Sequence, residues 1–165
     1  MVKPTLRAVV FLLLAAPSCL AQQAAAPLLR VSGGGADLSL TAADLAAFPK
    51  AVVDIKEPHS GEQQHYEGVR LSDVLTKAGV PLGEKLRGAE MASYVVARAS
   101  DGYKVVFSLA ELDPAMNGNE TIIAQTMNGK PLDAKQGPLK IVVPGEKRPA
   151  RWIRMLQSLE VVRVE

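Results

Sequence analysis

The sequence predicts an α+β domain, a strand-rich mixed sheet accompanied by short helices. Most apolar segments are short, rich in Val and Ile, and bounded by Gly, Pro, Asn or Asp, which is typical of strands between turns. The segments with helical spacing of apolar residues are also short. Strand-like and helix-like segments do not alternate regularly, which argues against a doubly wound parallel sheet.

The predicted strands have three kinds of sequence signal. Residues 51–56 alternate apolar and charged side chains, as a half-buried strand does, and 139–143 is a β-branched apolar run typical of a buried strand. Ser100-Asp101-Gly102 separates two β-rich segments and favours a hairpin. Residues 57–64 are predicted to be a polar loop. In chain order the strands are 28–32, 37–40, 51–56, 91–99, 103–107, 121–127, 139–143 and 152–164, the last bent or bulged because it is long.

Caps and glycines set the predicted turns and helices. Gly33 to Gly35 form a turn, because glycine adopts positive φ at little cost, and they lack the ending of a phosphate loop. Thr41 caps the first helix, and Asp44 places a carboxylate in its first turn. Ser72 opens the second helix and Ser108 caps the third. The predicted helices are 42–47, the segment between Ser72 and Gly79, and 108–112.

The N-terminus has the pattern of a secretory signal peptide. Lys3 and Arg7 precede an apolar run at 8–16, which is shorter than the ~20 residues that span a bilayer. Small residues, Cys19 and Ala21, stand at the two positions that a signal peptidase reads. We predict cleavage after Ala21 and a periplasmic or secreted protein. Acylation of Cys19 is the alternative, although the residues before it match a lipoprotein signal poorly.

The predicted mature chain, residues 22–165, is a single domain with no cysteine, so its core must stabilise it without disulfides. No stretch within it is long enough for a membrane span. Aromatic residues make up only 4% of the sequence and no basic stripe is present, which argues against nucleic-acid binding. Basic residues outnumber acidic ones from 128 to the C-terminus, which suits a small anionic ligand or, alternatively, a solvated surface.

Four motifs occur in order along the chain. They are Gly68–Leu75, Ala99–Tyr103 with Ser108-Leu109, Ile123–Leu132, and Val143-Pro144-Gly145 followed by a basic loop before Trp152. In this order they resemble the molybdopterin-binding domain of the sulfite oxidase family, over most of the mature chain. The resemblance implies the fold of that domain, a bound molybdopterin and an oxidoreductase role.

The resemblance also implies site residues. In the family, basic residues matching Arg148 and Arg151 contact the pterin cofactor, and we predict that Lys147 adds charge beside them. The planar guanidinium of Arg suits such phosphate recognition. Tyr103 and Asn128 are further pocket candidates. The alternatives are that the basic residues are solvent-facing loop charges and that Tyr103 and Asn128 only shape their turns.

One feature of the family is missing. A cysteine that binds molybdenum precedes the first motif in the family, and the corresponding residues 54–61 contain none. An oxygen or imidazole donor does not reproduce a soft thiolate without changing the chemistry, so oxygen-atom transfer needs a substitute ligand such as His59 or Glu57. His59, His65 and Glu57 are also the candidates for a small metal site, although their spacing matches no zinc or copper signature.

Three functions therefore stand as predictions. The first is a periplasmic molybdopterin-binding domain that acts as an oxidoreductase component with a periplasmic redox partner. The second is a non-catalytic member of the family that binds another small anion or a protein partner. The third is a metal-binding module built on the histidine loop.

Overall fold

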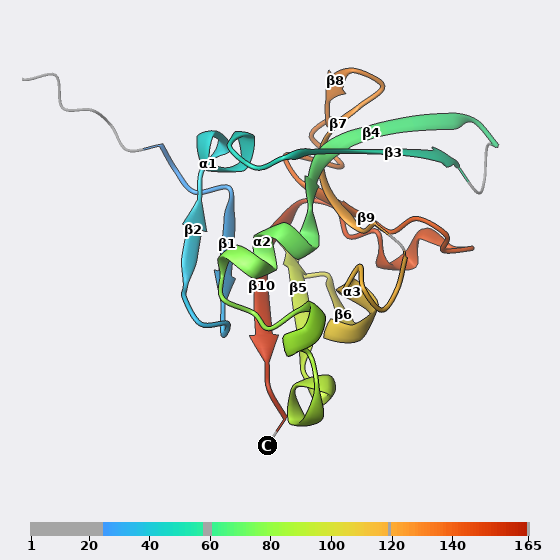
Figure 1. Ribbon diagram of the computed structural model, residues 1–165. Coiled ribbons are helices and arrows are strands. Elements are labelled where there is room, and N and C mark those ends of the chain that lie inside the picture. Colours follow the sequence, from blue (N-terminus) through green and yellow to red (C-terminus); the bar gives the residue numbers. More distant parts are fainter. Residues whose placement is uncertain (1–24, 58–60, 119, 165) are drawn as a thin grey trace, which may run out of the picture.

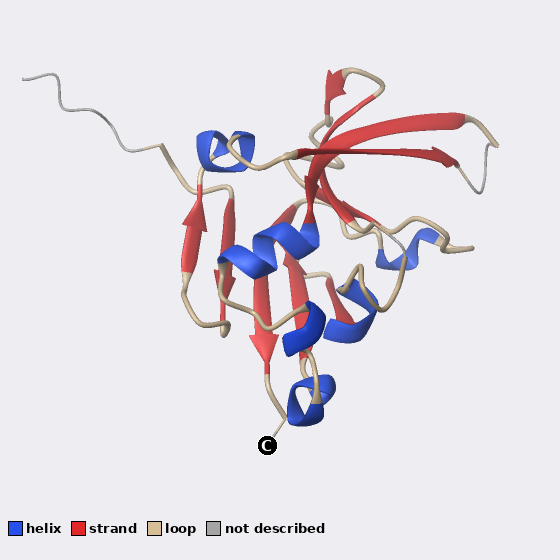
Figure 2. Ribbon diagram, viewed as in Figure 1, coloured by secondary structure: helices blue, strands red, loops and turns tan. Residues whose placement is uncertain are grey.

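The computed structural model describes residues 25–57, 61–118 and 120–164. These residues form two five-stranded sheets linked by short helices (Figure 1, Figure 2). The predicted α+β class, strand-rich with short helices, is confirmed. The predicted signal peptide, residues 1–21, lies outside the described residues.

The first sheet has the strand order β2-β1-β10-β5-β6. It is mixed, because β1 runs parallel to β10 while every other neighbouring pair in it is antiparallel. A register shift between Leu156 and Ser158 confirms the irregularity expected in the last strand. The strands are β1 (Leu29–Ser32), β2 (Leu38–Leu40), β5 (Tyr94–Ala99), β6 (Lys104–Ser108) and β10 (Leu156–Val162).

The second sheet has the order β3-β4-β7-β8, and β9 also pairs with β7. All of its pairs are antiparallel. Figure 1 shows β3 and β4 as a long hairpin that extends away from the rest of the molecule. Its strands are β3 (Lys50–Lys56), β4 (Gln63–Arg70), β7 (Ile122–Met127), β8 (Lys130–Pro131) and β9 (Lys140–Val142).

Short helices connect the strands. Both predicted caps, Thr41 and Ser108, are present, and each forms a capping box, Thr41 with Asp44 and Ser108 with Glu111. The prediction that Ser72 opens the second helix was wrong by one residue, because β4 leads directly into Leu71 and Ser72 is buried in the first turn. The helices are α1 (Ala42–Ala46), α2 (Leu71–Lys77) and α3 (Leu109–Leu112), with 3₁₀ turns η1 (Gly83–Lys85), η2 (Gly88–Ala92) and η3 (Pro149–Arg151).

The sequence prediction missed the strand β4 and misplaced the start of β5. The polar loop predicted at 57–64 is shorter, because β4 already begins at Gln63. Residues 63–65 are all polar, so no apolar alternation marks the beginning of a strand there. The strand predicted from Met91 begins only at Tyr94, because η2 occupies the preceding residues.

Close backbone contacts explain two glycine positions. A Cβ on Gly34 would lie 2.6 Å from the Ala78 carbonyl oxygen, which accepts a 2.8 Å hydrogen bond from the Gly35 N–H. The triple glycine thus packs the β1–β2 turn against the end of α2. A Cβ on Gly68 would lie 2.0 Å from the Ile123 carbonyl oxygen, at the bulge between β4 and β7.

A single core unites the two sheets and the helices. Its largest fully buried side chains come from β1, β4, β6, β7, β9 and all three α-helices, and they include Leu29, Tyr66, Leu75 and Phe107. In the described part of the chain no helix has both the length and the apolarity needed to cross a bilayer.

Candidate functional site

A half-open cavity of about 610 Å³ lies between the second sheet and the loops beside it. Its walls come from β4, β9, the β5–β6 turn, the loop before β9, and η3 with the residues after it. We call it the Lys140 cavity. It is lined by Glu57, Gln64, Tyr66, Asp101, Tyr103, Asp133, Lys135, Gln136, Lys140, Pro149, Ala150, Trp152, Ile153 and Arg154.

Lys140 is the most deeply buried charged residue of this wall. It opens β9 and is only 7% exposed. Its Nζ donates hydrogen bonds to Gln136 Oε1 at 2.7 Å and to Tyr66 Oη at 3.1 Å, both of them neutral acceptors. Among the described residues it forms no ion pair with a carboxylate. Its positive charge is therefore buried without a direct counter-charge.

Two aromatic rings hold the Lys140 ammonium group. Its Nζ lies 5.0 Å from the ring centroid of Tyr66 and 5.7 Å from that of Trp152. The two rings meet edge to face, with centroids 6.4 Å apart and planes at 89°. Such cation–π contacts stabilise the ammonium by about 0.5–2 kcal/mol, less than the several kcal/mol that burying an ion costs.

The local electrostatics follow from this burial. Desolvation and, to a smaller extent, the nearby Arg154 charge lower the pKa of Lys140 to about 8, against the opposing effect of Asp133 and Glu57. Burial also raises the pKa of the Tyr66 phenol, so this hydroxyl stays protonated. The hydroxyl donates a 2.6 Å hydrogen bond to Gln64 Oε1.

A buried donor behind the cavity wall is left without a partner. Trp152 is 6% exposed, and its indole Nε1, which is buried, has no hydrogen-bond partner among the described residues. An unpaired buried N–H costs about 1–3 kcal/mol. The donor that the cavity wall offers to an anionic ligand is therefore the Lys140 ammonium group, which has no direct counter-charge.

The rim carries charges of both signs. Two of its carboxylates shape the loops that bear them: Asp133 Oδ1 accepts the Lys135 N–H at 2.9 Å, and Asp101 Oδ1 accepts the Tyr103 N–H at 2.9 Å. Lys135 and Arg154 are exposed cations of the same cavity. The rim cations are therefore accessible to a ligand, whereas the Lys140 charge lies at depth.

One of the five predicted cofactor-binding residues lines this cavity. Tyr103 does, and its Oη donates a 2.8 Å hydrogen bond to the Ala150 carbonyl oxygen. Asn128 does not; it has φ 52° in the β7–β8 turn, and its Oδ1 accepts the His65 N–H at 2.9 Å. Lys147 and Arg148 are exposed on the loop before η3 and lie outside the lining.

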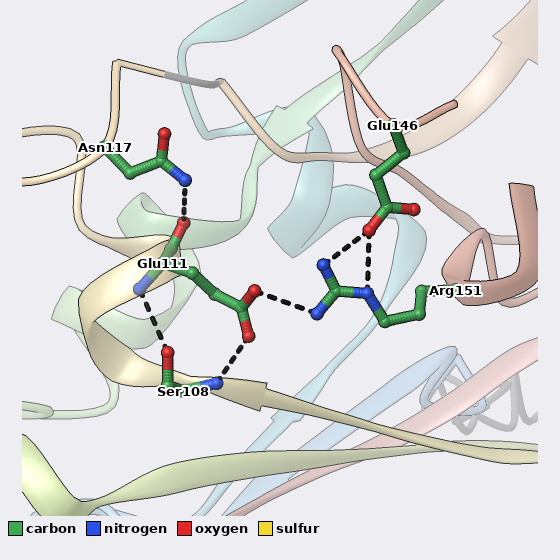
Figure 3. A network of polar contacts seen from close by, with 5 residues as sticks. All are labelled: Ser108, Glu111, Asn117, Glu146 and Arg151. Atoms are coloured by element: carbon green, nitrogen blue, oxygen red, sulfur yellow. Dashed lines mark hydrogen bonds and ion pairs between the residues drawn. The ribbon is translucent and has the colours of Figure 1, made fainter. Parts of the chain in front are cut away.

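Arg151 points into an acidic network instead of the cavity (Figure 3). Its Nε donates to Glu146 Oε1 at 2.7 Å and its Nη1 donates to Glu111 Oε2 at 2.8 Å. Its guanidinium also lies 5.0 Å from the ring centroid of Phe107. Two carboxylates therefore neutralise one of the two arginines that the sequence motif predicts to contact the pterin cofactor.

Of the three residues of the predicted metal site, the structure describes His65 and Glu57. His65 Nδ1 lies 2.7 Å from Asp54 Oδ1 and its Nε2 lies 3.3 Å from Glu67 Oε1, and these carboxylates raise its pKa. Glu57 lines the Lys140 cavity, and His59 is outside the described residues. Within 25–57, 61–118 and 120–164, no group of His, Cys, Asp and Glu is arranged to hold a metal ion.

The sequence interpretation missed Lys140, Gln136 and Tyr66 as site residues. One signal was available, because Lys140 is the only charged residue within the run predicted to be a buried strand. A charge at such a position is buried only when it has hydrogen-bond partners or a function. Nothing in the local sequence indicates that Tyr66, more than seventy positions away, supplies one of its partners.

Comparison with protein families gives one match. A family model described as oxidoreductase molybdopterin binding domain matches residues 22–165. No curated protein matches the chain.

Proposed function

This chain belongs to the family of oxidoreductase molybdopterin-binding domains, and from that premise we propose that it is an exported domain that binds a small anionic ligand in the Lys140 cavity. In this proposal the domain does not perform oxygen-atom transfer on thiolate-ligated molybdenum. It corresponds to the second of the three functions that the sequence predicts.

The burial of an uncompensated ammonium group carries the proposal. An unpaired buried charge is costly, and the two neutral acceptors and two rings around Lys140 offset only part of that cost. An anion in the cavity supplies the missing counter-charge. The rim cations Lys135 and Arg154 can contact such a ligand, although the rim also carries the carboxylates of Glu57, Asp101 and Asp133.

The pterin cofactor that this family binds fits the cavity in part. A cavity of about 610 Å³ is within the usual range for small-molecule sites, and its donors suit an anionic heterocycle. The metal end does not fit, because the described residues contain no cysteine and the only cysteine in the sequence is Cys19. Without a soft thiolate the known chemistry of such a centre is not available, so we derive no redox step for this chain.

Export is the second part of the proposal. The apolar run near the N-terminus supports it, and the family match begins at residue 22, directly after the predicted cleavage site. The mass of the mature protein from a bacterial periplasm tests this. A chain beginning at Gln22 is expected; an acylated chain beginning at Cys19 would replace it with the lipoprotein alternative, and an uncleaved chain would refute export.

The ligand is tested on the exported protein, purified from a host that makes molybdopterin. Molybdenum and pterin are measured first, and the melting temperature is then recorded with phosphate, sulfate and short carboxylates. We expect no stoichiometric molybdenum and a higher melting temperature with at least one anion. Lys140→Gln should weaken that binding at least about tenfold, since a hydrogen bond to a charged group contributes about 1.5–3 kcal/mol.

The matched control is the double variant Lys147→Gln with Arg148→Gln, which removes more charge from the neighbouring loop and leaves the cavity lining intact. It should keep the anion response. Stoichiometric molybdenum and pterin in the wild-type protein would instead support the oxidoreductase component with its periplasmic redox partner. A protein that responds to no anion and holds no pterin would overturn the proposal.

A further inference from the structure

We propose that Lys140 is a reactive amine, and that the ligand class of its cavity is the small oxo acids, carboxylic acids that also bear an aldehyde or ketone. The amine and the carbonyl carbon form a reversible imine. This inference rests on the proposed anion-binding function and names its ligand class and its mode of capture.

The surroundings of Nζ favour an amine that loses its proton. Its two hydrogen-bond partners, Gln136 Oε1 and Tyr66 Oη, are neutral, and it has no ion pair among the described residues. Burial in the cavity wall disfavours the charged form, and Arg154 adds repulsion, while Asp133 and Glu57 act in the opposite sense from the rim. Reactive lysines are found in such desolvated positions.

Lys140 differs from the other lysines in the fraction of its amine that is unprotonated near neutral pH. With a pKa of about 8, about a quarter of Lys140 is unprotonated at about pH 7.5, against roughly 0.1% for a lysine of ordinary pKa. The unprotonated amine is the nucleophile, whereas the protonated majority still attracts the anion. The same side chain therefore serves both ligand attraction and covalent capture.

The covalent step needs no oxidant or reductant. The nitrogen lone pair attacks the carbonyl carbon, and the carbonyl oxygen becomes a hydroxyl group. That hydroxyl takes up a proton and leaves as water, the C–N bond becomes C=N, and the two amine protons end on the released water. Tyr66 Oη accepts a hydrogen bond from Nζ at 3.1 Å and donates its own proton to Gln64 Oε1, so the proton that the departing oxygen takes up comes from solvent in the cavity.

The rest of the cavity suits the acid group of such a ligand. Arg154 and Lys135 line the same cavity as Lys140 and are exposed, so a carboxylate can reach them. A ligand with a carboxylate and a carbonyl therefore engages the rim cations and the buried amine together.

Reductive trapping tests the imine. The exported protein is incubated with glyoxylate and sodium cyanoborohydride, and intact mass with peptide mapping locates the product. We expect one carboxymethyl group per chain on Lys140, formed at least about tenfold faster than on any exposed lysine because of its larger unprotonated fraction. Lys140→Arg keeps the charge and should not be trapped, while the cavity control Lys135→Arg should be trapped like the wild type.

Glycolate, the hydroxy analogue of glyoxylate, separates the two proposals. If both acids raise the melting temperature and compete, but no adduct forms on Lys140, the imine is refuted and anion binding stands. If neither acid binds and no adduct forms, the oxo-acid proposal fails, and the anion-binding proposal fails with it only if phosphate and sulfate also leave the melting temperature unchanged. Equal labelling of many lysines, or full labelling of Lys140→Arg, would also refute a reactive Lys140.

Discussion

The basic loop and the Lys140 cavity lie close together in the sequence and differ in what surrounds their charges. In the loop, Arg151 meets two carboxylates, and Lys147 and Arg148 are exposed to solvent. In the cavity, Lys140 is 7% exposed and meets only neutral acceptors and aromatic rings. The loop has more positive charge, yet the buried charge is that of Lys140, which has no ion pair among the described residues.

This difference shows that the availability of a charge, and not the density of charge along the sequence, decides where an anion binds. A guanidinium that already donates to two carboxylates gains little from a third acceptor, because the new contact must replace an existing one. An exposed lysine gains little because water screens the interaction. A buried ammonium without a counter-charge gains the most.

The largest expected effect is a pH-dependent stability difference between the wild type and Lys140→Met. The pKa of Lys140 is about 8 in the folded chain, below its ordinary value of 10.5, so between these values the unfolded chain binds more protons and stability rises with pH. Lys140→Met has no titrating group at this position, so its free energy of unfolding lacks this contribution. Wild-type stability relative to the variant should therefore increase by up to about 3 kcal/mol from pH 7 to pH 10.5, measured by urea denaturation.

Because the wild type and Lys140→Met differ at one residue, the titration of all other groups cancels in the difference between their free energies of unfolding. A difference that stays constant across this pH range would show that Lys140 titrates normally, and would remove the electrostatic basis of the cavity's ligand preference. Below about pH 7 the variant should be as stable as the wild type or more so, because replacing a buried charge by an apolar chain is often neutral or stabilising.

The second effect concerns the acidic network around Arg151. Arg151→Ala should destabilise the fold by about 1–3 kcal/mol, because it leaves Glu146 and Glu111 without their shared cation. The side chain is 37% exposed, so solvent screening keeps the loss below that of a fully buried pair. Chemical denaturation measures it. Arg148→Ala, a change on the same loop, is the control and should cost less than about 0.5 kcal/mol.

The ligand response of Arg151→Ala sharpens the comparison. If the folded variant still responds to anions as the wild type does, Arg151 stabilises the loop and is not a ligand contact. A loss of anion binding without a loss of stability would return Arg151 to the cofactor-binding role that the sequence motif predicts.

A smaller effect is expected at the cap of α3. Ser108 Oγ accepts the Glu111 N–H at 3.2 Å, and Glu111 Oε1 accepts the Ser108 N–H at 2.6 Å while its other oxygen binds Arg151. Ser108→Ala should therefore cost about 1 kcal/mol in the free energy of unfolding. Thr41→Ala is the matched control, because it removes the cap of α1, whose capping-box carboxylate, Asp44, binds Thr41 and forms no ion pair with an arginine among the described residues. A larger loss at Ser108 than at Thr41 would indicate that the cap and the Arg151 network are coupled.

The sequence predicted the local elements better than the site. Apolar alternation, turn glycines and capping boxes each act over a few residues, so 51–56, the β5–β6 hairpin and the Thr41 cap could be derived directly. The partner strand β4 (Gln63–Arg70) was missed, because its first residues are all polar and show no apolar alternation.

The site depends on contacts that local sequence does not encode. Tyr66 and Lys140 lie on strands that both pair with β7, and only this pairing brings the phenol to the ammonium group. Glu111 and Arg151 are forty residues apart and meet through the packing of α3 on the η3 loop. The motif identified the loop correctly as basic, but it could not show which charges already have partners.

The smallest expected effect is at the two exposed cations of the basic loop. Replacing Lys147 and Arg148 by Gln should change the free energy of unfolding by less than about 0.5 kcal/mol, because both side chains are exposed. Their field still reaches the cavity through solvent at low ionic strength, where the screening length is about 30 Å at 0.01 M salt, and it is largely screened at 0.15 M. Anion affinity should therefore fall slightly in dilute buffer and match the wild type at physiological salt, in a calorimetric titration at both. A loss that persists at high salt would mean a direct contact from the loop, and would place the anion there instead of beside Lys140.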